Sequence, residues 1–493
     1  MLRTLAFYLP QFHRVPENDE WWGEGFTDWI AVKRAEKLFE GHNQPRVPLN
    51  NNYYNLLEHD TMAWQAELMK KYRVDGMCIY HYWFENGRRI LEKPAENLLK
   101  WNDIQMPFCF YWANRTWVRT WEKLTNASVW SAAYETPKRQ NETGILLRQS
   151  YGREKDWEEH FLYLLPFFLD ERYIKLNNRP IFVIYKPNDI FSLWDMAEYF
   201  DRRARQSGFE GIYFIGSEGE IIQGLNAAFE RKPDSRSTSY DEMWEMTLNS
   251  KLEKGNKTYF CGGVDFDNSP RMGKDGFIIK GASPQKFYKY FKRLYKKSML
   301  LDNEFIFINA WNEWGEGMYL EPDEKYRYGY LESIQRVVEE CENETLKGET
   351  EDIPIYYDAE ETIFLKKKMK NLLRYNTLVN NWLCLKERRI DFSLYFNRYG
   401  YQNIAIYGMG RLGMHLLYEL HESSVKVSCG IDENNERIEC EVDVYNPKQK
   451  IPKIDAVVIT ITDQYSEISR RLRKNIDCPM ITIEEVVQEL MLQ

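Results

Sequence analysis

The segment Phe305–Asp323 reads FIFINAWNEWGEGMYLEPD, and the interpretation of the whole chain starts from it. It begins with the continuous apolar run Phe305–Ile308, which is typical of a strand buried on both faces. Carboxylates, indole rings and glycines follow directly behind this run. The segment therefore predicts a buried strand that brings acidic and aromatic side chains to the place where it ends.

Glu313 and Glu316 are the candidate catalytic residues of this segment. A carboxylate placed beside indole rings and away from water raises its own pKa, which is costly unless chemistry uses it. Residues three apart point to opposite faces of an extended strand, so the chain must turn for both to face one pocket. Gly315 and Gly317 permit such a turn. The alternative is a surface loop with solvated glutamates, which fits poorly with the two neighbouring tryptophans.

The same pattern occurs earlier in the chain, where apolar runs end in polar and aromatic residues. The runs cover 2–9, 77–80, 107–111, 180–185 and 212–215, the last ending in Gly216, Ser217 and Glu218, and helical patterns begin near Asp60 and at Ser283–Pro284. Strands alternating with helices over this length predict a (β/α)8 TIM-type barrel, whose active site lies at the carboxyl ends of the strands.

The residues expected to bind substrate come from the ends of these strands and from the loops behind them. The loop after the third strand also carries Trp121. The substrate-binding candidates are Tyr8, Gln11, His13, Trp22, Glu24, His81, Tyr82, Trp83, Trp112, Asn114, Trp117, Asp267, Asn268, Arg271, Asn312, Trp314 and Glu321.

Length and composition set limits on the architecture and on the partners. A chain of 493 residues accommodates a barrel of about 250 residues or more together with a smaller domain. A net charge of -9 argues against nucleic acid as a partner. No apolar run approaches transmembrane length, and the eight cysteines lack metal-like or disulfide-framework spacing. We therefore expect no metal site, no transmembrane segment and a cytoplasmic location.

The character of the sequence changes after the barrel. We expect the barrel at 1–345, a linker and bridging helix at 346–390, and a small Rossmann-like parallel α/β domain at 391–493. In the last of these, Gly408, Gly410 and Gly413 lie between a strand and a helix, and Asp432 ends the next strand, as in a dinucleotide-binding fingerprint. The unit either binds a dinucleotide or nucleotide there, or serves packing or regulation without a cofactor.

Several motifs of the first 340 residues together resemble the WbsX family of bacterial O-antigen and capsule gene clusters. They are AFYLPQFH at 6–13, WGEGF at 22–26, HYWF at 81–84 and NEWGEG at 312–317 with Glu321-Pro322. The family is similar in fold, and in the Glu-Trp-x-Glu motif, to the endo-alpha-mannosidases of glycoside hydrolase family 99. The resemblance implies retaining chemistry at mannoside-like bonds, without a cofactor in the barrel.

The resemblance also implies roles for the two glutamates. Glu313 would deprotonate the sugar's own 2-hydroxyl to give a 1,2-anhydro intermediate, and Glu316 would act first as acid and then as base. The ordinary two-carboxylate mechanism would make one of them a nucleophile instead. The expected function is cleavage or transfer of a glycosidic bond during synthesis of O-antigen, capsule or lipopolysaccharide. The substrate would be an oligosaccharide or polysaccharide, with peripheral association with a lipid-linked glycan.

Two alternatives stay open from the sequence. Asp265-Phe266-Asp267 matches the Asp-x-Asp of nucleotide-sugar-dependent glycosyltransferases, although a barrel strand end explains these residues without a metal. The chain also has Arg115 where relatives carry an acidic residue, a departure that favours an inactive glycan-binding protein and that affects sugar contacts more than the glutamate pair.

Overall fold

The computed structural model describes residues 2–118, 127–129, 145–217, 225–230, 239–347 and 353–492, and the statements below concern these residues. The expectations at Trp121 and Glu218, and residues 348–352 of the expected linker, lie outside them. The chain divides into two compact units, which are Met1–Asp189 with Met196–Tyr357, and Ile190–Asp195 with Asp358–Gln493.

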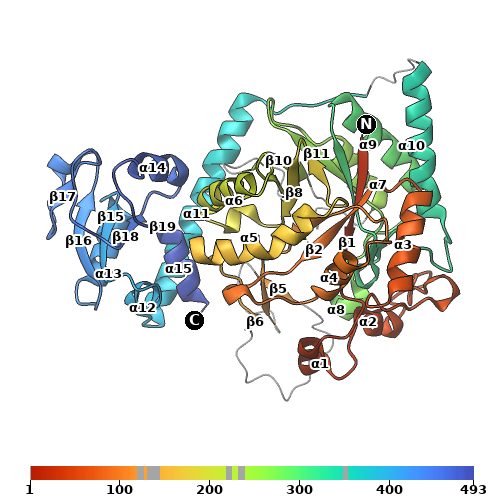
Figure 1. Ribbon diagram of the computed structural model, residues 1–493, viewed down its shortest axis with the longest axis horizontal. Coiled ribbons are helices and arrows are strands. Elements are labelled where there is room, and N and C mark those ends of the chain that lie inside the picture. The colour runs from red at the N-terminus through yellow and green to blue at the C-terminus, as the bar shows by residue number, and fades with distance from the viewer. Residues whose placement is uncertain are drawn as a thin grey trace. The chain divides into compact units, whose positions relative to one another are not determined.

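The first unit is a closed barrel of eight parallel strands (Figure 1). The strands pair side by side in the order β3-β2-β1-β12-β11-β10-β9-β8. The pairing of β3 with β8 closes this sheet into a ring, in which the first strand β1 lies beside the last strand β12. The strands are β1 Arg3–Tyr8, β2 Gly76–His81, β3 Phe108–Trp112, β8 Arg179–Ile184, β9 Tyr213–Gly216, β10 Ala227–Glu230, β11 Thr258–Gly263 and β12 Phe305–Asn309. The predicted barrel is confirmed.

Helices surround this barrel, and short elements decorate its loops. The helices are α1 Pro16–Trp22, α2 Asp28–Arg34, α3 His59–Lys71, α4 Lys93–Lys100, α5 Glu154–Leu169, α6 Leu193–Gln206, α7 Tyr240–Leu248, α8 Ser269–Met272, α9 Pro284–Leu300 and α10 Gly329–Lys347. The short helical turns are η1 Leu49–Asn51, η2 Glu85–Gly87, η5 Pro187–Asp189, η6 Gly273–Asp275 and η7 Trp314–Glu316. The short strands are β4 Thr116–Val118, β5 Ala127–Val129, β6 Ile145–Leu147, β7 Lys175–Leu176, β13 Asn312–Glu313 and β14 Met318–Tyr319.

Aromatic rings fill the interior of the barrel. Phe7 packs against Tyr111, Phe229 and Phe307 with ring centroids 4.9, 5.4 and 5.6 Å apart, and Tyr80 lies 5.1 Å from Tyr111. These residues come from five strands, so the high aromatic content of the chain supplies much of its core.

Local signals in the sequence account for several of these elements. The Ser283 hydroxyl accepts a hydrogen bond from the amide of Lys286 and caps α9, and Pro284 occupies the first helical position. The sequence did not predict β10 or β11 as strands. β10 has only four residues, and both strands adjoin polar stretches. The hydrophobic periodicity and the length of the apolar runs therefore gave little indication of a strand at either place.

The second unit has a five-stranded parallel sheet with the order β17-β16-β15-β18-β19. Its strands are β15 Asn403–Tyr407, β16 Lys426–Ile431, β17 Val444–Tyr445, β18 Ala456–Ile459 and β19 Met480–Thr482. Its helices are α11 Glu360–Glu387, α12 Ser393–Arg398, α13 Arg411–Leu420, α14 Tyr465–Leu472 and α15 Ile483–Met491, with the short turn η8 Asn435–Arg437. None of the described helices is long and apolar enough to cross a bilayer.

Candidate active site

The glutamate pair lies on a tight hairpin at the end of β12. Strands β13 and β14 pair antiparallel, and η7 turns the chain between them. Glu313 is the last residue of β13 and Glu316 is the last residue of η7, so the chain leaves the strand as the spacing requires. Gly317 closes the turn with a φ of 67°, a conformation that favours glycine.

Gly315 has a different role from the one expected of it. A Cβ atom at this position would lie 2.6 Å from the Nε atom of Arg271 and 2.7 Å from a carboxylate oxygen of Asp28. Glycine is needed here because an ion pair packs directly on the backbone, and not because of an unusual φ.

Arg271 of α8 joins the acidic residues of the site. Its Nη1 donates to Oε1 of Glu316 at 2.6 Å, and its Nη2 lies 3.8 Å from Oε2 of Glu313. Its Nε and Nη2 also donate to the two carboxylate oxygens of Asp28 at 3.1 and 2.9 Å. One guanidinium therefore lies beside three carboxylates, and its hydrogen bond to Glu316 fixes the orientation of that candidate catalytic group.

The two glutamates differ in their access to water. The Glu316 side chain is 27% exposed, whereas that of Glu313 is 6% exposed. Burial alone lowers the pKa of Arg271, but the charges of Asp28, Glu316 and Glu313 outweigh burial and raise that pKa above its usual value. The cation is thus permanent, and Glu316 is the carboxylate that a solvent-borne substrate reaches more easily.

Aromatic residues adjoin the pair on another side. Burial raises the pKa of Tyr82 well above its usual value, and the nearby charge of Glu313 raises it further. The ring of Trp117 packs edge-on against Tyr82 with centroids 5.2 Å apart, and Trp21 of α1 lies 6.1 Å from Trp117. Tyr82 and Trp117, both predicted to bind substrate, therefore belong to the surroundings of Glu313.

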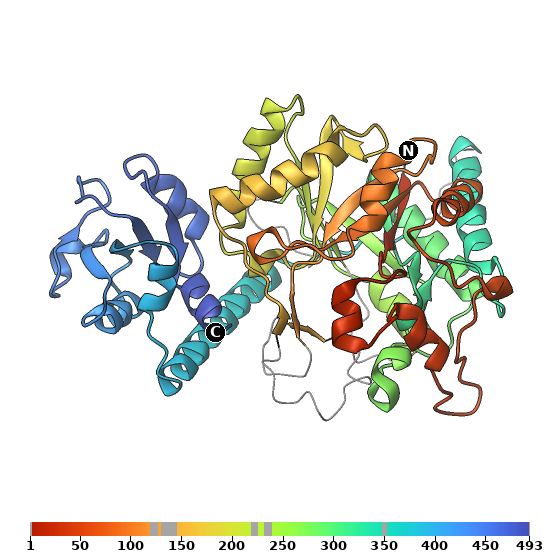
Figure 2. The same cartoon turned by 60° about the horizontal axis from the view of Figure 1, so that its bottom comes forward.

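Two residues that the sequence analysis missed belong to the same region, where α1, α2 and α8 lie at one end of the barrel (Figures 1 and 2). Asp28 is the first residue of α2 and holds Arg271. In the sequence, an aspartate at this position indicates only the start of a helix and does not indicate a site residue. Asn18 lies one turn from Trp21 on α1, and it is fully buried with neither amide atom paired among the described residues. A buried unpaired amide is costly, so Asn18 is a candidate partner for a sugar hydroxyl.

Glu321 occupies a closed environment a few residues downstream. It accepts hydrogen bonds from the indoles of Trp311 at 3.0 Å and Trp314 at 2.7 Å, from the hydroxyl of Tyr54 at 2.8 Å and from the amide of Gln65 at 2.7 Å. Burial raises the pKa of Glu321 to about 7, although the four donors partly oppose this. Four neutral donors fill this site, which we call the Glu321 cage.

The cage explains several residues that the sequence placed in the substrate site. The Tyr8 hydroxyl donates a hydrogen bond to Oε1 of Gln65 at 2.7 Å and so helps to orient one of the four donors of the Glu321 cage. Asn312 bonds the backbone amide and carbonyl of Leu9, at 2.7 and 3.0 Å, and ties the hairpin to the end of β1. Trp314 stacks on Tyr319 with ring centroids 3.7 Å apart. These buried side chains, with Glu321, hold the hairpin in place.

The aspartates of the Asp-x-Asp stretch have protein partners. Asp265 pairs with Arg46 at 2.9 Å. Asp267 accepts from Gln44 at 2.7 Å and from Nε2 of His42 at 2.9 Å, where Nε2 is the donor because Nδ1 accepts from the Leu38 amide. Burial raises the pKa of Asp267, but Arg46 and the hydrogen bonds lower it more. No cluster of metal-binding residues occurs among the residues that the structure describes.

The aromatic strand end at 81–84 is divided between two faces. The Nε2 atoms of His81 and of His160 in α5 lie 2.8 Å apart. The Trp83 ring stacks on the His160 ring with centroids 4.5 Å apart. Trp112 donates to the carbonyl of Trp83 at 3.1 Å. Burial lowers the pKa of His81 to about 3. His81 and Trp83 therefore contact His160 of α5, and Trp83 and Trp112 line a pocket with His160. That these three residues bind substrate stays a prediction.

Other predicted residues lie in mixed positions. Asn114 clamps the backbone of Lys186, with amide and carbonyl contacts of 2.8 and 2.9 Å, and the side chain of Asn268 accepts from the Phe277 amide at 2.7 Å. Glu24 is 92% exposed and lies 3.8 Å from Arg14. These three therefore serve local structure or face solvent.

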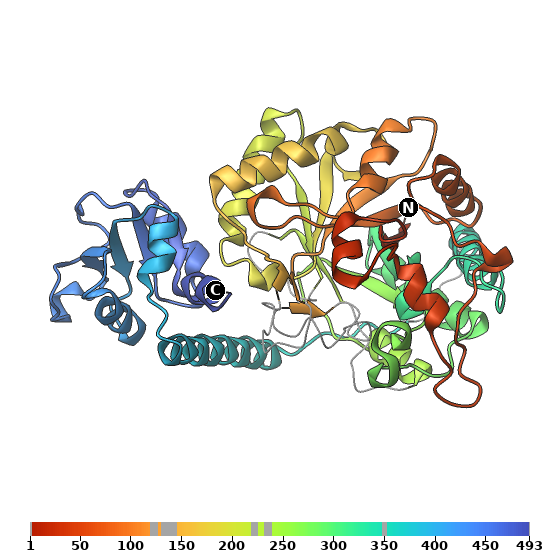
Figure 3. The ribbon, with the colours of Figure 1, turned by 90° about the horizontal axis from the view of Figure 1, so that it is seen from below.

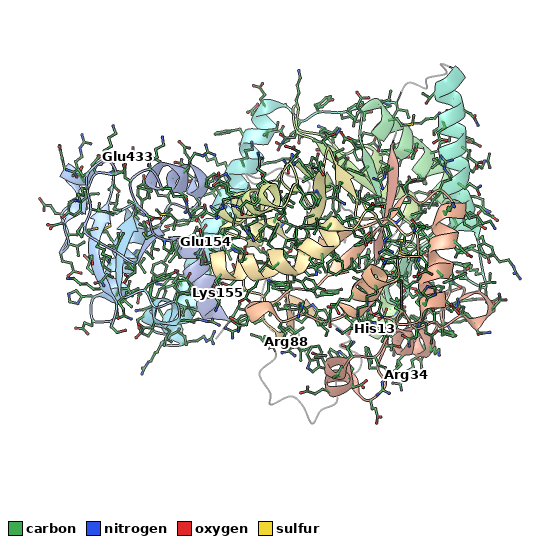
Figure 4. The ribbon with its side chains drawn as sticks, viewed as in Figure 1. His13, Arg34, Arg88, Glu154, Lys155 and Glu433 are labelled. Atoms are coloured by element: carbon green, nitrogen blue, oxygen red, sulfur yellow. The ribbon has the colours of Figure 1, made fainter. Side chains whose placement is uncertain are left out.

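The residues that follow β1 are buried beneath the loops. Gln11 and His13 are almost fully buried, and Figure 4 shows His13 at the same end of the barrel as α2 and α8. Burial lowers the pKa of His13 to about 4, so its ring is neutral at pH 7. Trp22 packs on Phe26 with ring centroids 6.2 Å apart and is partly exposed. These three remain candidates for sugar contacts.

The glycine-rich loop of the second unit resembles a phosphate-binding turn in part. Gly408 has a φ of 88°, and a Cβ on Gly413 would lie 2.2 Å from the Gly408 carbonyl, so both positions require glycine. Nothing lies within 4 Å of a Cβ built on Gly410, which leaves that backbone open. Asp432, however, accepts from the amides of Met409 at 2.9 Å and Asn434 at 2.8 Å, so it holds the loop itself.

Residues 4–237 and 220–334 match the family described as Glycosyltransferase WbsX. The uncharacterized protein WxcX of two strains of Xanthomonas campestris pv. campestris is 29% identical over 370 residues, covering 68% of this chain and 49% of the relative. The chain thus spans about half the length of the curated relatives it matches.

Among solved structures, similarity is found to carbohydrate-active enzymes. The GH99 endo-alpha-mannosidase from Bacteroides thetaiotaomicron has a TM-score of 0.45 and 14% identity, covering 70% of this chain and 100% of that chain. A glycoside hydrolase-like protein has a TM-score of 0.43 and 9% identity, covering 68% of this chain and 93% of that chain.

Proposed function

The chain belongs to the glycosyltransferase WbsX family, and from this premise we propose that it cleaves or transfers a glycosidic bond of a surface polysaccharide, using Glu313 and Glu316. The substrate class that we propose is a mannoside-like oligosaccharide or polysaccharide. A hydroxyl acceptor would give transfer, and water would give hydrolysis, at the same site.

The observation that carries this proposal is the sharing of Arg271 by the two glutamates. Glu316 lies 2.6 Å and Glu313 lies 3.8 Å from the same guanidinium, at the carboxyl end of the barrel strands. Active sites of such barrels are built at this end. Two carboxylates beside one cation, one of them reaching water, form a suitable acid and base pair.

The mechanism that we propose divides the work between the two side chains. Glu313 takes the proton of the sugar 2-hydroxyl, whose oxygen attacks the anomeric carbon while the glycosidic bond breaks. Glu316 gives its proton to the departing oxygen. In the second step Glu316 takes a proton from the incoming hydroxyl or water, whose oxygen opens the anhydro ring, and the 2-oxygen regains its proton from Glu313. Arg271 acts as a positioning residue, because it holds Glu316 and lies beside Glu313.

Glu316→Gln tests the role of this pair. The amide keeps the shape of the side chain but cannot give or take the proton, so we expect turnover to fall about 10²–10⁴-fold while glycan binding remains. The measurement is release or transfer of labelled sugar from mannose-containing and related glycans, with calorimetry for binding. A variant with wild-type turnover on a substrate that the enzyme accepts would exclude this role.

A matched control uses Glu321→Gln, which makes the same chemical change just after the same hairpin. Because Glu321 contacts only protein donors among the described residues, we expect its variant to lose stability and to keep turnover when folded. Equal loss of turnover in both variants at full folding would remove the distinction between them.

A second candidate is a transferase that uses a nucleotide sugar, which the family description favours. The Asp-x-Asp stretch supports it weakly, because Asp265 and Asp267 are held by Arg46, His42 and Gln44. Calorimetry with a panel of nucleotide sugars and manganese tests it. Binding that Asp267→Asn abolishes would favour this candidate over the glycosidase-like mechanism.

For the second unit we propose a Rossmann-like fold that binds a nucleotide or dinucleotide at Gly408, Gly410 and Gly413. Counted from β15, its strand order is 3-2-1-4-5, as in the first five strands of the doubly wound order. The open backbone at Gly410 suits a close approach of phosphate. A ligand held only by the folded chain raises the melting temperature, so titration with NAD, NADP and nucleotide sugars tests this.

We also propose that the enzyme works in the cytoplasm. Support comes from the cysteines, since all eight are free thiols and five of them are buried. Free thiols persist in a reducing compartment. Fractionation of cells that express the chain, followed by immunodetection, tests the location.

A further inference from the structure

The N-terminal half of α11 exposes large apolar side chains. The helix is continuous from Glu360 to Glu387 (Figure 3), and its C-terminal half buries Leu378, Trp382 and Leu385 in the core of the second unit. The earlier half carries six exposed residues, which we call the apolar face and whose exposed fractions range from 41% to 64%. They are Phe364, Leu365, Met369, Leu372, Leu373 and Tyr375.

Solvent exposure of so many large apolar groups on one helical segment is unusual. Leu365, Met369 and Leu372 follow one another at intervals of four and three residues, so they lie along one side of the helix. Single exposed apolar residues are normal, but a contiguous apolar face marks a surface that binds something. The face therefore requires a partner.

The charges of the same segment indicate what that partner is. Between Phe364 and Tyr375 the chain has five basic residues and no acidic one, although the whole chain has a net charge of -9. Lys366 pairs with Asp358 at 2.5 Å, and Arg374 pairs with Glu484 at 2.8 Å. Lys367 and Lys368 are exposed to solvent. A negatively charged partner complements this segment.

The pattern distinguishes a lipid surface from a second copy of the chain. A two-stranded coiled coil needs a narrow apolar seam sustained over about three to four heptads. Here the side of the helix that carries Leu365 and Leu372 continues into Val379, which packs against the core of the second unit, before Leu383 is exposed again, so the exposed seam is interrupted. Lysines beside the seam would also repel their copies. A short, broad apolar face on a helix whose remaining side is basic is instead typical of a helix that lies in a membrane interface.

We propose that α11 docks on an anionic lipid surface, with its apolar face among the lipid chains and its lysines at the headgroups. The residues Phe364 to Tyr375 form this site. It lies outside the glutamate pair and does not depend on the reaction that the barrel performs. Its consequence would be to hold the enzyme at a membrane that carries its glycan substrate.

Flotation of the full chain with lipid vesicles tests this proposal. We expect binding to vesicles that contain phosphatidylglycerol together with phosphatidylcholine, and little binding to phosphatidylcholine alone. Leu372→Ser with Leu373→Ser should abolish binding. Lys367→Gln with Lys368→Gln should weaken it about 30-fold, since each basic residue near an anionic surface contributes a factor of about five.

The matched control is Lys450→Gln with Lys453→Gln, which removes the same charge from exposed positions elsewhere in the second unit. We expect this control to bind as the wild type does, and equal melting temperatures would show that all variants fold. Absence of binding to anionic vesicles would overturn the proposal. A dimer in sedimentation velocity that the leucine variant converts to monomer, without vesicle binding, would assign the face to a second copy and overturn it as well.

Discussion

Glu316 lies in the hairpin and Glu321 lies two residues after its second strand, yet their environments are opposite. Glu316 is partly exposed and pairs with a permanent cation, Arg271, at 2.6 Å. Glu321 is buried and receives four hydrogen bonds from neutral donors. The Glu321 cage satisfies both carboxylate oxygens, whereas the Glu316 side chain reaches water. The comparison teaches that an acidic residue beside tryptophans can be structural, and that its donors and exposure decide which role it has.

Removal of the Arg271 cation, which pairs with Glu316, should produce the largest change in the free energy of unfolding. Arg271→Met leaves Asp28 buried without its partner, so we expect a loss of about 3–5 kcal/mol in the free energy of unfolding. Urea denaturation measures it. Arg34→Met, at an exposed position of α2, is the matched control and should change stability by no more than about 0.5 kcal/mol. An equally small loss in Arg271→Met would mean that the cation does not hold this site together.

The next largest effect is expected in the Glu321 cage. Glu321→Gln replaces an acceptor oxygen by an amide that faces donors, so we expect a loss of about 1–3 kcal/mol in the free energy of unfolding. The same change at the more exposed Glu316 should cost less than about 1 kcal/mol. Denaturation of both variants measures the difference. Equal losses of stability would contradict the assignment of Glu321 to structure.

The pH dependence of stability sharpens the comparison further. The pKa of Glu321 is about 7 in the folded chain, against an ordinary value of 4.5. Between these values the folded chain binds more protons than the unfolded chain, so this group makes the free energy of unfolding fall as pH rises, by up to about 3 kcal/mol.

His13 acts in the opposite direction, because burial lowers its pKa to about 4. The unfolded chain then binds more protons up to about pH 6.5, and stability from this group rises with pH. The useful measurement is therefore the difference between wild type and Glu321→Gln in urea at pH 5 and pH 7. Glu321→Gln should lose less stability than the wild type, or gain more, over this interval. Parallel profiles would show that Glu321 does not titrate there.

The smallest effect is expected at Glu24, which the sequence analysis placed in the substrate site. Its side chain is 92% exposed, so Glu24→Gln should change the free energy of unfolding by no more than about 0.5 kcal/mol. Turnover should also stay at the wild-type level. A tenfold loss of turnover would show that Glu24 belongs to the substrate site. It would also show that a highly exposed carboxylate can contribute to catalysis here.

Local patterns in the sequence predicted much of the barrel. Apolar runs such as Phe305–Ile308 and Ile181–Ile184 are buried strands, and Ser283 with Pro284 marks the start of α9. These features are local because burial on both faces and helix capping each depend on a few consecutive residues. The four-residue strand β10 offered too short a run for the same reasoning.

The environment of each predicted site residue was beyond the sequence. Arg271 meets Asp28 although they are 243 positions apart, and Gln65 reaches Glu321 across 256 positions. Spacing placed two glutamates in one turn, and Arg271 was only one of the predicted substrate-binding residues. It did not show that His81 points toward α5, nor that Trp314 serves the Glu321 cage.

The sequence by itself determined that an apolar strand ends in a turn carrying Glu313 and Glu316, with Glu321 a few residues further on. Only the tertiary structure decided which of these carboxylates meets a cation and solvent and which meets neutral donors. The reason is physical, since strand and turn formation depend on neighbours along the chain, while the charge and access to water of a carboxylate depend on segments that folding brings to it.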